Sequence, residues 1–425
     1  MKPRDGLVRR AGRRSLVSFA LTVSGMAVGL VMQALVAREL GSAGYGVFGI
    51  ILSALMVLSS LLPLGWFEST PKFVAEYREG QQHSLMWGLV TRSQQFCGLT
   101  TLVCSLGFLA LEQIWRPDPN TAMVLLGIAL LLPSYTLIRI QQQILLTLQH
   151  VRDGLVFVHL VSPTVVILGM VIWRNPGIDG VVTLYLVGNL VALLLQGLRL
   201  RRVLPGPPVR EYRTRYWQKV ASSLMAGLMG QRLINQGDVM MLSPFVGVSQ
   251  VGIYALARRL VDVLAFANQA LASAVAPMLG GAIVGKRYAQ AHKLLWMGCL
   301  GSGLWALPFT LMGMFFPTEI LSYFGNTFQG GELILQISLV GAFLNAASGP
   351  VGQALLIGGH EQFWRRSAAV TTVFGLTGCL VGAAMFGEIG IAVMRSLYIA
   401  SISIWRLAYL NDSLSRSLRE SEPSA

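Results

Sequence analysis

Charged residues are scarce in this 425-residue chain, since Asp, Glu, Lys and Arg make up 12% of it whereas 54% of the residues are hydrophobic. The mean hydropathy is +0.60. A globular protein of this size needs more charge than this to cover its surface in water. The shortage of charge therefore excludes a water-soluble globular protein and indicates an integral membrane protein.

Cysteine and histidine are rare as well. The four cysteines lie inside apolar runs without paired spacing, which is typical of packing residues. No two of the five histidines have the spacing of metal ligands, so we expect no metal and no other cofactor.

Motifs of nucleotide binding and of catalysis are also missing. Residues 280–287 read GGAIVGKR, but Arg287 stands where a phosphate-binding loop needs Ser or Thr to hold Mg²⁺. No G-x-S-x-G elbow or carboxylate pair stands out. The outer loops that we predict are short and leave no room for an extramembrane catalytic domain. We therefore expect that the protein is not an enzyme.

Apolar runs of roughly 20 residues, long enough to cross ~30 Å of hydrocarbon as a helix, recur along the chain. Continuous runs such as residues 161–172 do not alternate as the strands of a membrane β-barrel would. The sequence therefore predicts an all-α integral membrane protein with about twelve transmembrane helices. The expected spans are 16–37, 44–67, 85–111, 122–148, 154–173, 180–198, 220–244, 252–279, 294–316, 331–357, 367–386 and 390–410.

An internal repeat divides the chain into halves. Two glycines and a proline recur 206 residues later, as Gly41 and Gly247, Gly46 and Gly252, Pro71 and Pro277. Repeated halves are common in secondary transporters, and six spans per half would relate the lobes by a pseudo-two-fold axis along the membrane normal. The expected parts are an N-terminal six-helix lobe (1–198), a basic cytoplasmic linker (199–219), a C-terminal six-helix lobe (220–410) and a cytoplasmic tail (411–425).

The net charge of +14 could suggest a nucleic-acid partner, but the 33 Lys and Arg residues are distributed as in a membrane protein. With the amino terminus in the cytoplasm, only Arg38, Arg116 and Arg174 fall at outer loops. This is the positive-inside bias. We therefore expect a multi-pass protein of the cytoplasmic (inner) membrane with both termini in the cytoplasm, membrane lipids as partners and no nucleic acid.

Basic residues inside the spans are the sharper indication of function, because ionisable groups in hydrocarbon are costly and face a cavity or a partner. Arg232 lies near the middle of the seventh span, too deep to reach water by snorkelling. Arg258 and Arg259 lie within the eighth span, and Arg139 lies in the polar inner half of the fourth. Arginine binds phosphate bidentately and stays charged, so these residues favour an anionic substrate.

Acidic residues accompany these arginines in the second half. Asp238 lies deep in the seventh span and can form an ion pair with Arg258 or Arg259 on the eighth. Asp262 follows the two arginines by four and three residues and can pair with one of them within the helix. Arg395 is shallow in the last span, where snorkelling or a structural ion pair is expected. The positions 206 residues before Arg232, Asp238, Arg258 and Asp262 are apolar, namely Met26, Met32, Leu52 and Met56, so we expect this charge to belong to one half only.

The segment 37–48 (ARELGSAGYGVF), followed by 71–77 (PKFVAEY), resembles the polysaccharide and O-antigen exporters of the multidrug/oligosaccharidyl-lipid/polysaccharide superfamily. Residues 251–260 (VGIYALARRL) resemble the same family. The resemblance implies a two-lobed flippase that moves an undecaprenyl-diphosphate-linked oligosaccharide to the outer leaflet by alternating access, in cell-surface polysaccharide biosynthesis. The family often carries cavity cations in its first helix, whereas here the first span has none before Arg38.

This hypothesis gives the intramembrane polar residues their roles. Four arginines would hold the diphosphate and sugar acids: Arg232, Arg258, Arg259 and Arg139. Polar side chains would face the glycan: Gln33, Asn235, Gln236 and Asn268. Asp238 and Asp262 could couple transport to protons or sodium, or could serve as structural ion-pair partners. Transport could also respond to the membrane potential, and other polysaccharide-assembly proteins are possible partners.

Other classes of membrane protein fit the sequence less well. A cation-coupled multidrug exporter of the same superfamily is the alternative. Its cavity would need acidic side chains without an ion-pair partner, and the predicted spans contain few acidic residues. A major-facilitator transporter would have a glycine- and arginine-rich second cytoplasmic loop, which is absent. A polymerase or ligase would need a large outer loop, and a scaffold would not explain a charged midplane.

Overall fold

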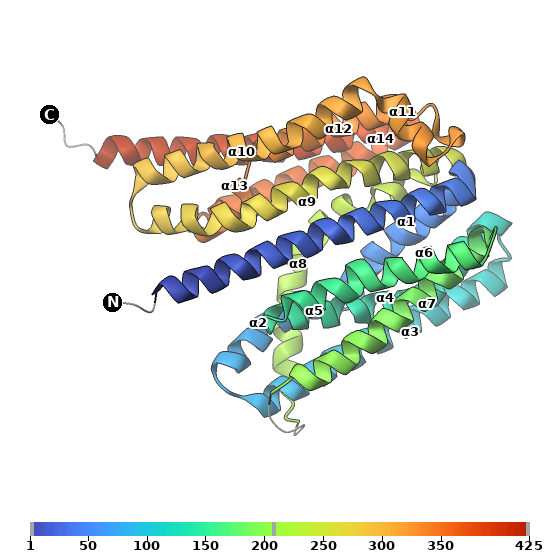
Figure 1. The fold of residues 1–425 in the computed structure, drawn as a ribbon, viewed down its shortest axis with the longest axis horizontal. Coiled ribbons are helices and arrows are strands. Elements are labelled where there is room, and N and C mark those ends of the chain that lie inside the picture. Colours follow the sequence, from blue (N-terminus) through green and yellow to red (C-terminus); the bar gives the residue numbers. More distant parts are fainter. Residues whose placement is uncertain (1–3, 206–209, 422–425) are drawn as a thin grey trace. The chain divides into compact units, whose positions relative to one another are not determined.

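The computed structural model describes residues 4–205 and 210–421, and all regular elements within these two ranges are helices (Figure 1). The chain divides into two compact units, Met1–Arg232 and Leu233–Ala425. The boundary falls inside one helix, α8 (Thr214–Leu242). The all-helical, two-lobed prediction is confirmed.

The first unit is a bundle of long helices. Within it α3, α4 and α7 pack side by side, and α1 packs against α4 and α6 (Figure 1). Helix α1 is broken at Gly41, whose φ of 61° lies in the left-handed region that glycine adopts without strain. Besides the start of α8, its helices are α1 (Arg4–Leu61), α2 (Trp66–Glu79), α3 (His83–Trp115), α4 (Pro119–Thr147), α5 (Val151–Val156), the π-helix η1 (Phe157–Val161), α6 (Ser162–Ile172) and α7 (Gly177–Val203).

The second unit is built in a similar way. Helix α12 packs against α9, α10 and α14, and α14 is broken at Gly387, where φ is 59°. After the end of α8, its helices are α9 (Val248–Val284), α10 (Tyr288–Phe315), α11 (Pro317–Phe324), the 3₁₀ helix η2 (Asn326–Phe328), α12 (Glu332–Ala347), α13 (Val351–Ile357) and α14 (Glu361–Ser421).

Eight helical segments in the described part of the chain are long and apolar enough to cross a membrane. Two of them, Ala20–Leu61 and Glu361–Arg419, contain the breaks at Gly41 and Gly387 and so comprise two helices each. Helices α8 and α9, of 29 and 37 residues, lie where the seventh and eighth spans are expected. A multi-pass membrane protein is therefore supported, and the number of twelve crossings stays a prediction.

The repeated glycine has the same place in both halves. Gly41 separates the two helices that make up α1. Gly247 is the N-cap of α9 and so separates α8 from α9, and its backbone N–H donates to Gln250 Oε1 at 3.0 Å. In each half this glycine thus ends the first long helix and precedes the second.

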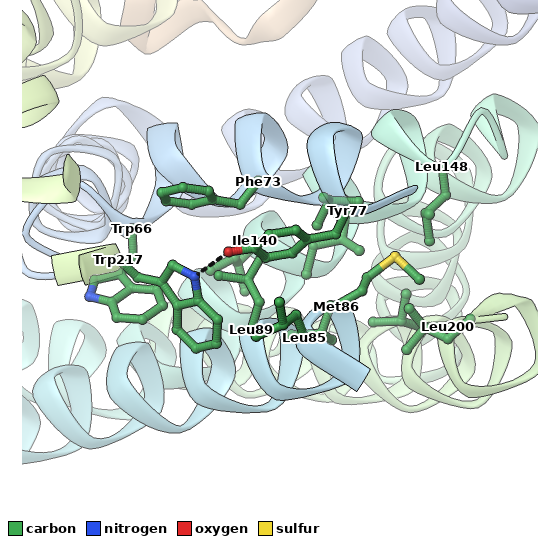
Figure 2. Close-up of a cluster of buried hydrophobic side chains, with 14 of the residues drawn as sticks. Trp66, Phe73, Tyr77, Leu85, Met86, Leu89, Ile140, Leu148, Leu200 and Trp217 are labelled. Atoms are coloured by element: carbon green, nitrogen blue, oxygen red, sulfur yellow. Dashed lines mark hydrogen bonds between the residues drawn. The ribbon is translucent and has the colours of Figure 1, made fainter. Parts of the chain in front are cut away.

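Aromatic side chains fix the start of α8 within the first unit (Figure 2). Trp217 is fully buried and its Nε1 donates to the Tyr77 hydroxyl of α2 at 2.8 Å. Burial raises the pKa of Tyr77, so this hydroxyl stays protonated at neutral pH. Trp66 Nε1 donates to Gln218 Oε1 at 2.6 Å. The first turns of α8 are therefore part of the first bundle, although Trp217 and Gln218 fall within the predicted linker 199–219.

Replacement of Gly65 by alanine should weaken this anchor. Gly65 has φ of 85°, and a Cβ at this position would lie 1.9 Å from the carbonyl oxygen of Ala221. We expect Gly65→Ala to lower the free energy of unfolding by about 2 kcal/mol, measured by thermal unfolding in detergent. The matched control is Gly107→Ala, because a Cβ at Gly107 meets nothing within 4 Å. Equal stability of the two variants would show that α8 is not held here.

Candidate functional site

The deepest predicted arginine forms an ion pair within the first unit. Arg232 Nη2 lies 3.3 Å from Oε1 of Glu68, and these side chains are 33% and 14% exposed. The Arg232 guanidinium also lies over the Phe67 ring, 5.8 Å from its centroid. Arg232 therefore contacts two residues at the start of α2. The sequence predicted that the charge belongs to the second half only, whereas this charged group also includes a residue of the first half.

Arg139 of α4 reaches the same aromatic ring. Its guanidinium lies 5.0 Å from the Phe67 centroid and 5.8 Å from that of Tyr135. Arg139 Nη1 donates to Ser59 Oγ at 2.9 Å. Two guanidinium groups thus contact one largely buried ring, and a cation at an aromatic face is favourable when it is partly desolvated.

We call Arg139, Arg232, Glu68, Phe67 and Ser59 the Phe67 cluster. It holds two arginines and one carboxylate, so its formal charge is positive. Partly exposed guanidinium groups with only one acid nearby can accept a further anion. The second span predicted from the sequence ends at residue 67, so Glu68 is not among the candidate residues of the sequence. Residue spacing does not show which groups meet between α2 and α8.

A second charged group surrounds Asp238 in the second unit. Asp238 Oδ2 lies 3.2 Å from Nε of Arg258 and 2.8 Å from Nε of Arg395, and it accepts the Tyr254 hydroxyl hydrogen bond at 3.0 Å. Asp238 and Arg395 are almost fully buried. We call these four residues the Asp238 network. Arg395 on α14 is almost fully buried and pairs with Asp238 on α8, which is the structural ion pair that its sequence position allowed.

Arg258 uses all of its nitrogens within the second unit. Its Nε donates to Asp238, its Nη1 forms an ion pair with Asp262, and its Nη2 donates to the carbonyl of Asn235 at 3.4 Å. A substrate would have to displace one of these acceptors to bind this side chain. Through these contacts, Arg258 on α9 connects this helix to α8.

The other predicted residues are spread over both units. Gln33 is buried and accepts the Tyr45 hydroxyl hydrogen bond at 2.8 Å. The Asn235 side chain is exposed, whereas Gln236 and Arg259 are half-buried. The side chain of Asn268 lies outside the described residues. The structure thus brings Arg139 and Arg232 together, and joins Arg258 with Asp238 and Asp262 in a separate group.

No metal centre emerges in the part of the chain that the structure describes, where no three His, Cys, Asp or Glu side chains are close enough to share an ion. The charged groups of both clusters are arginines and carboxylates on helices. Such an arrangement can bind and release an anion, but it offers no activated nucleophile.

Solved structures define the class of fold. The chain resembles an inward-facing multidrug resistance MATE family transporter of the MOP superfamily, with 12% identity, a TM-score of 0.74, and 96% of this chain and 99% of that chain covered. It also resembles the Vibrio cholerae MATE transporter VcmN in its bent form, with 14% identity, a TM-score of 0.63, and coverage of 95% and 97%. At such identities the likeness shows a MATE-type fold.

The sequence defines the family more closely. The family model described as polysaccharide biosynthesis protein matches residues 11–282, and the chain belongs to this family. No curated protein matches the sequence significantly. The resemblance noted in the motifs of the sequence is therefore confirmed at the level of the family.

Proposed function

We propose that the protein is a flippase that moves an undecaprenyl-diphosphate-linked oligosaccharide across the cytoplasmic membrane by alternating access. The polysaccharide biosynthesis family and the MATE-type fold both support transport in such a pathway. The direction is from the inner to the outer leaflet, where cell-surface polysaccharides are assembled. Both termini lie in the cytoplasm, because the basic residues gather on that side.

The Phe67 cluster is the observation that carries this proposal. Arg232 and Arg139 lie against one ring, and Glu68 is the single acid that contacts them in the described residues. A diphosphate carries more negative charge than a carboxylate and offers more acceptor oxygens. It would displace Glu68 from Arg232, bind both guanidinium groups and leave its prenyl chain in the lipid.

The alternative is a cation-coupled multidrug exporter, which the fold also fits. A cationic substrate needs an acid that is free to bind it. Glu68 is paired with Arg232, and both Asp238 and Asp262 are paired with Arg258. These ion pairs support an anionic substrate, and they support a structural role for Asp238 and Asp262, one of the two roles considered from the sequence.

Substitution of Glu68 tests the displacement directly. Glu68→Gln keeps the shape of the side chain but removes the charge that competes for Arg232. We expect polyprenyl diphosphate to bind the purified variant about three-fold more tightly than wild type, in line with the modest free energy of a partly exposed ion pair. Binding can be measured by native mass spectrometry.

The matched control is Glu79→Gln, since Glu79 is exposed at the end of the same helix. It should leave the affinity unchanged. The order of ligands matters as well, because the proposal predicts tighter binding of polyprenyl diphosphate than of the monophosphate or the free alcohol. Equal binding of the diphosphate and the alcohol would contradict the role of the arginines.

A further inference from the structure

A polar pocket lies within the first unit, apart from the Phe67 cluster. It has a volume of about 350 Å³ and is lined by α3, α4 and α7, with Leu204 and Arg210 after the end of α7. Its polar lining includes Gln94, Gln95 and Gln141, together with the basic side chains Arg201 and Arg210. No acidic residue is among the described residues that line it. A roomy, basic and acid-free pocket is suited to an anion.

A buried glutamine in this pocket favours a ligand that carries a hydrogen-bond donor. Gln141 is 6% exposed, and its Nε2 donates to Gln94 Oε1 at 3.2 Å. Its Oε1 has no hydrogen-bond partner among the described residues. A buried acceptor without a donor is costly, so a ligand that brings a hydroxyl or ammonium group would be favoured here.

The two arginines that line this pocket are carried by α7 and by backbone bonded to α3. Arg201 lies in the last turn of α7. Pro205 and Glu211 are each bonded to α3, because Trp87 Nε1 donates to the Pro205 carbonyl at 3.1 Å and the Glu211 backbone N–H donates to the Ser84 carbonyl, also at 3.1 Å. The bond at Glu211 restricts where the side chain of the neighbouring Arg210 can reach.

Part of the pocket lining is apolar. Leu194 and Leu198 line it, and they are 63% and 46% exposed within the unit. They lie one turn apart on α7, and this helix leads to Arg201 at its predicted cytoplasmic end. Exposed leucines next to arginines at a membrane boundary match the junction of acyl chains and head groups.

We propose that this pocket binds the head group of an anionic glycerophospholipid from the cytoplasmic leaflet. Arg201 and Arg210 bind the phosphate, Gln141 Oε1 accepts a hydrogen bond from a head-group hydroxyl, and the acyl chains lie along Leu194 and Leu198. The ligand class is a phosphodiester lipid with a hydroxyl donor, such as phosphatidylglycerol. This site does not depend on the transport activity proposed above.

The test is a lipid titration of the full-length, delipidated protein in detergent, followed by native mass spectrometry with dioleoyl phosphatidylglycerol. We expect the double variant Arg201→Gln/Arg210→Gln to bind this lipid about ten-fold more weakly than wild type. The control Arg202→Gln/Arg215→Gln removes the same charge from exposed positions that do not line the pocket. It should change the affinity less than about two-fold, since isolated surface charges contribute little.

Two further arms separate the possible ligands. Gln141→Leu should weaken phosphatidylglycerol binding about five-fold while leaving the phosphate contacts in place. Millimolar inorganic phosphate should not displace the lipid. The proposal is overturned if free phosphate displaces it, if the control double variant binds as weakly as the pocket variant, or if the pocket variant loses polyprenyl diphosphate binding more than phosphatidylglycerol binding.

Discussion

The Arg232→Ala variant is expected to flip a lipid-linked oligosaccharide about 100-fold more slowly than wild type. Arg232 donates charge-assisted hydrogen bonds, which contribute about 1.5–3 kcal/mol each when a substrate anion accepts them. Its removal also leaves the largely buried Glu68 without its guanidinium partner, and this carboxylate would repel a diphosphate. A loss of about 2.7 kcal/mol corresponds to a 100-fold lower rate.

Three matched variants separate charge from geometry. Arg232→Lys keeps the charge but loses bidentate binding, so we expect a loss of about ten-fold. Addition of Glu68→Gln to Arg232→Ala should restore part of the rate, because the repulsive charge is gone. Arg92→Ala removes an exposed arginine from α3 and should keep the wild-type rate. A folded Arg232→Ala protein with more than half of the wild-type rate would contradict the role of the Phe67 cluster.

The Asp238→Asn variant is expected to lose about 3–5 kcal/mol of stability, because breaking a buried ion pair leaves its partner uncompensated. Here two cations depend on one carboxylate, since both Arg258 and Arg395 pair with Asp238. Arg258 keeps its ion pair with Asp262. Arg395 would lose its ion-pair partner while almost fully buried, so it accounts for most of the expected loss.

Thermal unfolding in detergent measures this effect against a surface control. Asp412 pairs with Arg416, but these side chains are 56% and 74% exposed. Asp412→Asn should therefore cost less than about 1 kcal/mol. Combining Asp238→Asn with Arg395→Met should recover part of the stability by removing the uncompensated cation. Similar unfolding midpoints for Asp238→Asn and Asp412→Asn would show that the Asp238 network does not stabilise the second unit.

The helices could be predicted well from the sequence, because hydrophobic runs are local. The run predicted at 122–148 corresponds to α4 (Pro119–Thr147), and the run at 294–316 corresponds to α10 (Tyr288–Phe315). The repeated Gly41 and Gly247 indicated where the first helix of each half ends. The presence of a helix can be predicted from the composition and the hydrophobic periodicity of a segment, without knowledge of the tertiary structure.

The partners of the charged residues could be predicted only in part. Asp262 and Arg258 are four residues apart on one helix, so their ion pair follows from helical geometry. Glu68 and Arg232 are separated by 164 positions, and Asp238 and Arg395 also lie far apart in the chain. Sequence depth within a span says how far a residue is from water, but not which helix face it occupies or what lies opposite.

Trans-bilayer movement of a fluorescent polyprenyl-diphosphate oligosaccharide in proteoliposomes is the most direct test of the central claim. Wild-type protein, Arg232→Ala and empty liposomes would be compared, with a cationic dye as a second substrate. We predict that wild type accelerates movement of the anionic lipid, that the substitution lowers this rate about 100-fold and that the dye is not exported. Export of the dye without acceleration of the lipid would contradict the flippase account and support a drug exporter.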